Sequence, residues 1–408
     1  MVYTGIDGSV LHVSLALMAL FVATSQTGCA DTRPSGVQDI AKATNHQVAS
    51  VMLPPPVVLK PAAPAPYRVP PHAFRVSSSA QLRSALSDHR SQAIVLADGA
   101  YDNGSSFSNR DGDRIYAAHL GKAVLRAGVV LGSNAGASGA SLRGIRFDVD
   151  DPAKAFDGSI VHVWGSAKNA AVRDTWLDGN GVVDAGMVVR QPEGFVAQRV
   201  VAHAFRGYGV LVDPNQDHYR ARARYVLEDL TISHVMRPVA GASNGTAEAC
   251  LWLGSTGTVK RARVHSCGVS GVWTGSANTG SRVQDVTVDR TPVGIYIEHF
   301  TTGTTFRRLR VGPNVDRGVN AEWANHLLAG KPASVDNVIE SCYFHTRLIG
   351  VYFDEGTTRT VVRRCTFVGQ SRAGIGDYKG VGNRYYGNDF SRIAAGAMRV
   401  SHNHGGAQ

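Results

Sequence analysis

The chain has 408 residues, 45 of them glycine, and its 42 Lys and Arg residues against 32 Asp and Glu residues give a formal net charge of +10. Helical periodicity is weak, which favours a turn-rich β protein over a helical one. The length exceeds what one compact core usually holds, but a repeat protein grows by adding units and needs no second domain. The positive charge favours an anionic partner, unless most of these side chains are simply solvated.

Residues 1–30 have the features of an export signal. The apolar run from Ser9 to Thr24 is too short for a comfortable membrane span, and small residues and Cys29 follow it. Thr27-Gly28-Cys29 resembles a bacterial lipoprotein cleavage site, although Gln26 departs from that pattern. We expect an exported protein, extracellular or at the cell surface, whose membrane attachment, if any, is a lipid on Cys29.

Residues 31–72 show no periodicity and are rich in Pro and Ala, so they are predicted to be an extended linker. The folded domain is predicted over residues 73–400, followed by a tail over residues 401–408. Its first elements are a short helix within residues 76–86 and a strand over residues 93–101. This opening is similar to that of β-helix polysaccharide lyases, in which such a helix caps the open end of the coil. The Lys and Arg pair and the calcium motif of those lyases have no match here.

One pattern returns six times between about residue 258 and residue 390. Each copy has inward-type residues at relative positions 0, 3 and 5, and the first members are 24, 23, 33, 23 and 23 residues apart. A period in the low twenties is typical of a solenoid. The copies are Val259/Ala262/Val264, Val283/Val286/Val288, Phe306/Leu309/Val311, Ile339/Cys342/Phe344, Val362/Cys365/Phe367 and Tyr385/Asn388/Phe390.

A second alternating element follows each of the first five copies and is predicted to be a short strand. These elements open at Gly271, Gly294, Gly318, Gly350 and Ala373. Short strands stacked in register on the next repeat make a parallel β-helix. From Ala73 to Val400 the sequence therefore resembles the right-handed parallel β-helix proteins of the pectate-lyase-like superfamily. The resemblance implies an all-β, single-stranded right-handed parallel β-helix of about 10–12 coils with a short N-terminal capping helix.

Stacking in register places equivalent residues of successive coils about 4.8 Å apart, so they form ladders. Two ladders are predicted on the outside of the coil. The first, two positions after each opening residue, contains Trp273, Tyr296, Asn320, Tyr352 and Ile375, with Trp252 one coil earlier. The second, four positions after it, contains Gly275, Glu298, Glu322, Asp354 and Asp377. The sequence therefore predicts an aromatic ladder beside a run of four carboxylates.

The four carboxylates are the predicted catalytic residues. Like charges on neighbouring strands destabilise a sheet, so stability alone gives no reason to keep them. Glycoside hydrolysis uses two carboxyl groups, about 5 Å apart in retaining enzymes and about 6.5–9.5 Å apart in inverting ones, and neighbouring or alternate coils offer these spacings. We predict that Glu298, Glu322 and Asp354 perform the chemistry and that Asp377 assists. The alternative is that they are merely tolerated at a solvated strand end.

Substrate-binding residues are predicted beside this ladder, because aromatic rings stack well on sugars. Ordinary β-propensity is the alternative explanation for the aromatic residues. Insertions at residues 214–224, 236–248 and 325–334 are predicted to wall the groove. The predicted substrate-binding residues are Trp273, Tyr296, Tyr352, His299 and Lys379.

Three functions are compatible with this sequence. The leading one is a polysaccharide-degrading glycosidase. The second is a lyase or C5-epimerase for an acidic polysaccharide, in which the ladder would hold Ca²⁺ and Lys379 or Arg347 would take the proton. The third is a non-catalytic surface protein that binds glycan. The expected partner is a polysaccharide and not a nucleic acid, and we expect a monomer.

Histidines and cysteines give two further expectations. His203, His265 and His345 share one column, and we interpret them as turn residues in preference to a metal site. Cys342 and Cys365 occupy the same inward position of successive coils and should touch. An exported protein can form disulfides, and the sequence leaves open how these two, Cys250 and Cys267 pair.

Overall fold

The computed structural model describes residues 67–88, 90, 92–132, 137–165, 167–191, 193–213, 224–235, 249–275, 278–298, 300–321 and 334–402. The predicted export signal with Cys29 and most of the predicted linker lie outside these residues. The three predicted insertions also lie outside them, apart from Arg224 and Ser334. Within the described residues, no helix is long and apolar enough to cross a membrane.

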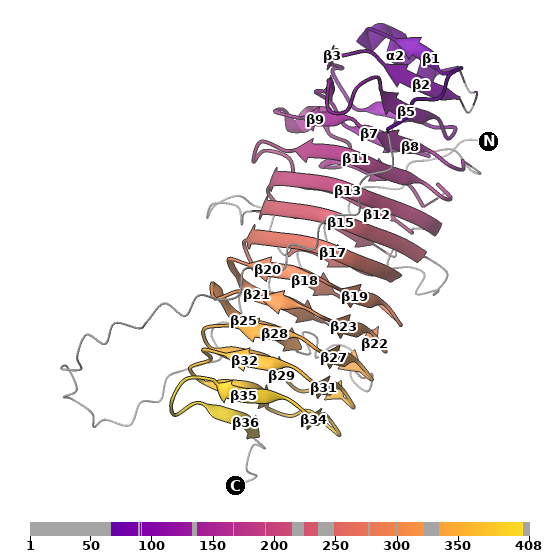
Figure 1. Cartoon of the computed structure of the whole chain (residues 1–408). Helices are drawn as coiled ribbons and strands as arrows, with labels where there is room; N and C mark the ends of the chain where they lie inside the picture. The colour runs from indigo at the N-terminus through magenta and orange to yellow at the C-terminus, as the bar shows by residue number, and fades with distance from the viewer. Residues whose placement is uncertain are drawn as a thin grey trace, which may run out of the picture. The chain divides into compact units, whose positions relative to one another are not determined.

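The described chain forms a parallel β-helix, in which each named strand pairs in parallel with strands of the neighbouring coils (Figure 1). One wall is a 12-stranded sheet that takes one strand from each coil. In chain order its strands are β4 (Phe107–Asn109), β7 (Val129–Leu131), β10 (Ser159–Val163), β12 (Ala185–Arg190), β14 (Tyr208–Asp213), β16 (Ala249–Leu253), β18 (Ser270–Thr274), β21 (Thr291–Ile297), β25 (Val315–Ala321), β29 (Ile349–Phe353), β33 (Ala373–Asp377) and β36 (Met398–His402).

The remaining walls belong mainly to a 21-stranded sheet that bends within each coil. Before the middle coils its strands are β1 (Phe74–Val76), β2 (Ala93–Leu96), β3 (Gly99–Tyr101), β5 (Arg114–Ala117), β6 (Ala123–Leu125), β8 (Ser141–Arg143) and β9 (Arg146–Asp148). Four middle coils have one long strand each, namely β11 (Ala171–Asp178), β13 (Glu193–Phe205), β15 (Arg224–Val235) and β17 (Thr256–Cys267). Later coils again have two short strands, namely β19 (Arg282–Gln284), β20 (Thr287–Asp289), β23 (Thr305–Arg307), β24 (Arg310–Val311), β27 (Val338–Glu340), β28 (Tyr343–His345), β31 (Val361–Arg363), β32 (Thr366–Val368), β34 (Arg384–Tyr386) and β35 (Asp389–Arg392).

Smaller elements complete the coil. A three-stranded sheet joins β22 (Thr301–Thr302), β26 (Ser334–Val335) and β30 (Thr357–Thr358), and η1 (Pro152–Lys154) is a single 3₁₀ turn. The predicted helix is α2 (Ser79–Leu86), whose N-cap Ser78 accepts a hydrogen bond from the Gln81 N–H at 3.2 Å. Its buried Leu82, Ala85 and Leu86 belong to the main core, which fits the predicted capping role.

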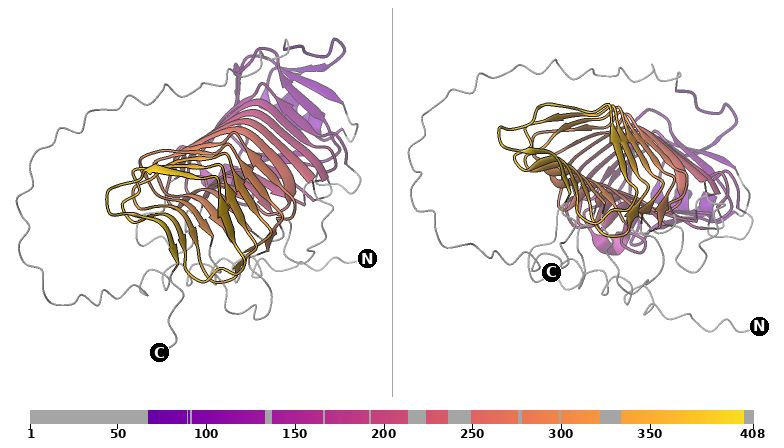
Figure 2. Two further views of the ribbon diagram at one scale, coloured as in Figure 1. Left: turned by 60° about the horizontal axis from the view of Figure 1, so that its bottom comes forward. Right: turned by 90° about the horizontal axis from the view of Figure 1, so that it is seen from below.

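The six predicted repeats stack in the predicted register. Val259, Val283, Phe306, Ile339, Val362 and Tyr385 pair in succession along the coil. All members of the first five copies are buried, whereas those of the last copy are half-buried because it lies in the final coil. Figure 2 brings this C-terminal end forward and shows the strands of successive coils lying behind one another. The core is therefore one continuous column of apolar side chains.

Glycines lie near the start of several strands of the 12-stranded sheet, where the coil leaves no room for a Cβ. A Cβ on Gly350 would lie 2.2 Å from the Phe367 ring and 2.6 Å from the Gly374 carbonyl oxygen of the next coil. Gly318 faces Phe344 in the same way. The rings of Phe344 and Phe367 stack with centroids 5.4 Å apart. The phenylalanine stack thus occupies space that the glycine column provides.

The cysteines separate into one bonded pair and one packed pair. Cys250 on β16 and Cys267 on β17 form a disulfide, a pairing that the sequence left open. Cys342 and Cys365 are buried free thiols. They touch as predicted, since the Cys342 N–H lies 3.4 Å from the Cys365 sulfur.

Residues at the bend of the 21-stranded sheet alternate in charge from coil to coil. They have left-handed backbone with φ between 51° and 57°, which non-glycine residues rarely adopt. Three acidic residues each accept hydrogen bonds from the arginine of the next coil. These bend pairs are Asp174 with Arg199, Asp229 with Arg261 and Asp285 with Arg308. The ion pairs help to hold each coil over the next at this bend.

Replacing Gly350 by alanine should destabilise the protein by roughly 1–3 kcal/mol, because the new Cβ overlaps Phe367 and a carbonyl oxygen. Equilibrium urea unfolding measures the difference. Gly104→Ala is the control, since a Cβ there meets nothing within 4 Å. Equal stability of the two variants would show that the core can move to accept a methyl group at position 350.

Replacing Asp285 by asparagine should cost roughly 1 kcal/mol at neutral pH, as expected for a partly exposed bidentate ion pair. The hydrogen bonds from Arg308 hold the pKa of the Asp285 carboxyl below its ordinary value. The ion pair therefore stabilises the fold fully above about pH 3.9, the pKa of Asp in the unfolded chain. This stabilisation is lost as the pH falls through the lower pKa of Asp285 in the folded protein. Urea unfolding of wild type and Asp285→Asn should give stabilities that converge in acid. The exposed Asp150 supplies a control, Asp150→Asn, that should change stability little at either pH.

Candidate functional site

The predicted aromatic ladder is present on the 12-stranded sheet. Trp252, Trp273, Tyr296, Asn320 and Tyr352 pair directly on successive strands. The prediction was wrong for Ile375, which is buried in the core, because Gly376 is the residue that pairs with Tyr352. The ladder therefore runs over five coils and ends at a glycine.

The aromatic rings in the middle of this ladder pack mainly on one another. Trp252, Trp273 and Tyr296 are only 6%, 5% and 9% exposed and form a cluster with Ala249. The Trp273 and Tyr296 ring centroids lie 4.4 Å apart. Tyr352 is half-buried and is thus the more accessible predicted stacking residue.

Arg317 belongs to this surface, although the sequence pattern did not single it out. Its guanidinium carbon lies 5.0 Å from the centre of the Tyr352 ring, and its Nη1 donates to the Asn320 side-chain oxygen at 3.1 Å. Arg317 precedes Asn320 by three residues in β25, which is an inconspicuous position in a strand. Only the pairing of β25 with β29 (Arg317 opposite Ile349, Asn320 opposite Tyr352) brings it beside the Tyr352 ring.

Glu298 is a buried carboxylate at the end of β21. It is 3% exposed, and the Trp273 indole N–H donates to its Oε2 at 2.9 Å. Gly275 makes room for it, because a Cβ on that glycine would lie 2.6 Å from the same oxygen. The aromatic ladder thus fixes the direction of this carboxylate by a hydrogen bond between neighbouring coils.

Asp354 lies in the same column two coils beyond Glu298. The residues that precede them, Ile297 and Phe353, both pair with Ala321. Two coils correspond to about 9.6 Å along the axis. Asp354 is half-buried and accepts a hydrogen bond from the Glu355 N–H at 2.8 Å. Glu322 and His299 lie outside the described residues.

The predicted position of Asp377 in the carboxylate ladder is wrong. Asp377 pairs with Phe353, one residue before Asp354, so it faces inward and is 5% exposed. It accepts hydrogen bonds from the Gly380 N–H, the Asn383 amide and the Tyr385 hydroxyl. The pKa of the Tyr385 hydroxyl is raised mainly by its burial and, to a smaller extent, by the neighbouring Asp377 carboxylate. The register is shifted because Ala373 pairs with Ile349 and not with Gly350.

The two predicted cationic groups both have acidic partners. Lys379 lies 3.1 Å from Glu355 and packs over the Tyr378 ring, and this bond to Glu355 raises its pKa. Arg347 lies 2.8 Å from Asp316 and precedes β29, so it stands before the strand whose far end carries Asp354. The structure thus brings Lys379 near the carboxylate ladder and leaves Arg347 at the opposite end of β29.

The histidine column gains a member that the sequence did not reveal. His234 lies between His203 and His265, with ring centroids 4.7 Å and 5.7 Å from them. It was missed because it occupies the next position of the turn. Burial and the neighbouring His234, Arg290 and Arg263 lower the pKa of His265. Among the described residues, no three His, Cys, Asp or Glu side chains are arranged to hold a metal ion.

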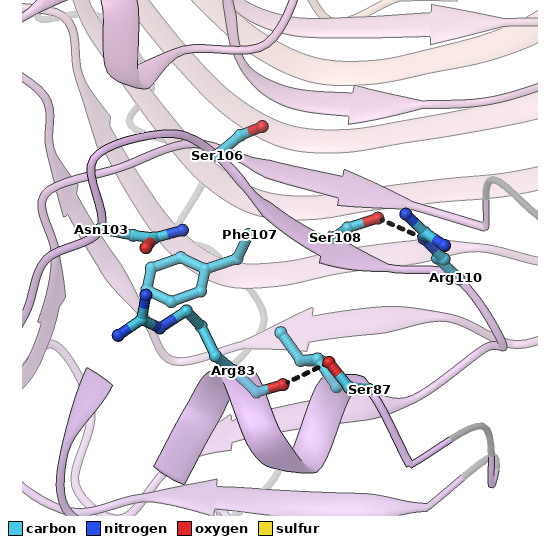
Figure 3. A pocket seen from close by; sticks show the side chains of 8 residues that line it. Arg83, Ser87, Asn103, Ser106, Phe107, Ser108 and Arg110 are labelled. Carbon is cyan, nitrogen blue, oxygen red and sulfur yellow. Dashed lines mark hydrogen bonds between the residues drawn. The ribbon is translucent and has the colours of Figure 1, made fainter. Parts of the chain in front are cut away.

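A hollow of about 280 Å³ lies at the other end of the coil, between α2 and β4 (Figure 3). Arg83 lines it from the helix and Ser87 from the helix C-cap, and Phe107 and Arg110 line it from β4 and the residue after it. Arg110 Nε donates to the Ser108 hydroxyl at 3.3 Å. This hollow belongs to the cap and is formed by none of the ladder residues.

Comparison with known proteins defines the class. Residues 208–390 match the family model described as "Right handed beta helix region". No curated protein matches the sequence. The chain is a right-handed parallel β-helix protein, as the repeat pattern predicted.

Solved structures with the same fold are distant in sequence. The catalytic unit of a thermostable GH87 α-1,3-glucanase from Streptomyces thermodiastaticus is 11% identical, with a TM-score of 0.53 over 83% of this chain and 68% of that chain. PfbA, a surface adhesin of Streptococcus pneumoniae, is 8% identical, with a TM-score of 0.51 over 76% and 85%. The Dettilon tailspike protein is 14% identical, with a TM-score of 0.48 over 79% of this chain and 64% of that chain. This chain thus spans less than two thirds of the tailspike. At these identities the likeness shows the fold alone.

The hydrogen bond from Trp273 to Glu298 can be measured without knowing a substrate. Trp273→Phe should lower stability by about 1.5–3 kcal/mol more than Trp252→Phe, because only Trp273 donates to a buried carboxylate. Urea unfolding of both variants gives this difference. In the background of Glu298→Gln the difference should become smaller, as a double-mutant cycle requires for coupled residues. Equal costs in both backgrounds would contradict the coupling.

Proposed function

We propose that this protein is an exported enzyme that hydrolyses a polysaccharide, with Glu298 and Asp354 as its two catalytic carboxyl groups. The observation that carries the proposal is the buried, directed carboxyl of Glu298. Burying a carboxylate costs free energy that an apolar side chain would not cost. A buried carboxylate in an otherwise apolar pattern departs from the local rules of the coil, and such departures are expected at functional sites.

The spacing of the two groups favours inversion. Their main-chain positions are about 9.6 Å apart, close to the upper limit of the carboxyl spacing of inverting enzymes and well above the spacing of about 5 Å in retaining ones. In this proposal the buried Glu298 protonates the leaving oxygen. The more exposed Asp354 removes a proton from the attacking water, and Tyr352 with Arg317 contacts the sugar.

The structural neighbours support two different roles for this fold. One is named an α-1,3-glucanase, which supports hydrolysis of a glycan. Another is named a surface adhesin, which supports the alternative of a non-catalytic glycan-binding protein. The lyase alternative has less support, because Lys379 and Arg347, the two groups expected to take the proton, are both engaged in ion pairs.

Incubation with a panel of neutral and acidic polysaccharides, followed by analysis of the products, tests the proposal. Wild type should release new reducing ends, and Glu298→Gln should lose at least about 100-fold of this activity, the usual effect of removing a general acid. Glu193→Gln removes an exposed carboxylate of the other sheet and should keep full activity. Circular dichroism should show that both variants are folded.

Other outcomes would refute hydrolysis. Products with the ultraviolet absorbance of unsaturated uronates would indicate a lyase. Glycan binding without any product, unchanged in Glu298→Gln, would indicate an adhesin.

The anomeric configuration of the first product, measured by NMR, tests the roles of the two carboxyl groups. Inversion of that configuration would support the two-coil spacing of Glu298 and Asp354.

A further inference from the structure

A column of polar residues runs along the outside of the 21-stranded sheet, immediately before the bend. Its members come from eleven successive strands and are mostly charged. In chain order they are Tyr116, Arg143, Arg173, Gln198, Glu228, Lys260, Gln284, Arg307, Glu340, Arg363 and Tyr386. We call this set the outer polar column.

In the C-terminal part of the outer polar column every cation has an acid on a neighbouring coil. Lys260 lies 3.9 Å from Glu228. Arg307 and Arg363 lie 3.5 Å and 2.7 Å from Glu340, which stands between them. Each positive side chain of this part therefore lies beside a carboxylate of a neighbouring coil.

Arg173 breaks this rule. Its neighbours in the column are Arg143 on one side and Gln198 on the other. The nearby Asp174 carboxylate already accepts hydrogen bonds from Arg143 and Arg199, and Gln198 donates to Glu228. Among the described residues, the Arg173 guanidinium has no ion pair and no hydrogen bond. Arg143 and Arg199 thus share the Asp174 carboxylate, and Arg173 beside them has no acidic partner within the described coils.

This arrangement is costly without a further anion. Arg143 and Arg173 are directly opposed at a spacing of about 4.8 Å, where like charges destabilise a sheet. Arg173 is also half-buried, so water screens its charge incompletely. Burial, with Arg143 and Arg199 beside it, lowers the pKa of Arg173. The surface formed by Arg143, Arg173 and Arg199 is therefore positively charged, because Asp174 is the one carboxylate in the described part of the chain that is bonded to this group of arginines.

We propose that Arg143, Arg173 and Arg199 form a binding site for a compact oxyanion, namely a carboxylate, sulfate or phosphate group presented by an acidic polymer. A guanidinium group can bind two oxygens of such an anion at once. Arg143 and Arg199 keep their bonds to Asp174, and Arg173 supplies the free donors. The site lies on a different sheet from Glu298 and does not depend on the proposed hydrolysis.

Isothermal titration calorimetry with three probes tests the proposal. Sodium sulfate, sodium phosphate and oligogalacturonate are each titrated into wild type, with sodium chloride of equal ionic strength as the reference. At least one probe should bind saturably, and the responding probe identifies which oxyanion the site prefers. Arg173→Gln should weaken its binding about tenfold or more, the factor expected for a lost charge-assisted hydrogen bond. Arg282→Gln removes an exposed arginine on the same sheet and should leave binding unchanged.

Thermal unfolding provides the second measurement. The responding anion should raise the melting temperature of wild type and of Arg282→Gln, but not that of Arg173→Gln. No saturable binding of any probe to wild type would overturn the site. Equal binding to wild type and Arg173→Gln would also overturn it. The site would also be refuted if Arg173→Gln is more stable than wild type and no anion stabilises wild type. That result would mean that Arg173 and its neighbouring arginines merely repel one another.

Discussion

Parallel stacking in register governs this molecule, because it places each residue directly over its equivalent in the next coil. At a spacing of about 4.8 Å, the charge and size of each side chain must suit its neighbours along the axis. The bend pairs satisfy this condition by alternating Asp and Arg, as in Asp229 with Arg261 and Asp285 with Arg308. A chain that skipped one coil would set Asp against Asp, so the alternation also opposes misalignment.

The same constraint determines volume in the core. Phe344, Phe367 and Phe390 stack along the axis, and the glycines at the start of the facing strands leave room for them. Neither column would pack alone, because the rings need the space that the absent Cβ atoms leave. The repeat therefore requires the phenylalanine column and the glycine column together.

The candidate site arises where a column reaches the end of its strand. Glu298 is directed by Trp273 of the preceding coil, and Gly275 leaves the space that its carboxylate occupies. Asp377 illustrates the opposite case. A shift of one residue turns that carboxylate inward, where Tyr385 and Asn383 bind it and it supports the final coil. Register therefore decides which acidic residues remain available for chemistry.

The sequence by itself determined the repeat period, the inward positions, the pairing of Trp273 with Tyr296 and the contact of Cys342 with Cys365, because side-chain alternation is a local property of each strand. The tertiary structure alone decided the inward shift of Asp377, the Cys250–Cys267 disulfide, the burial of the aromatic ladder and the arrival of His234 and Arg317 beside their partners. These features depend on how the turns between strands set one coil against the next. A turn that is one residue longer or shorter moves every following side chain to the other face.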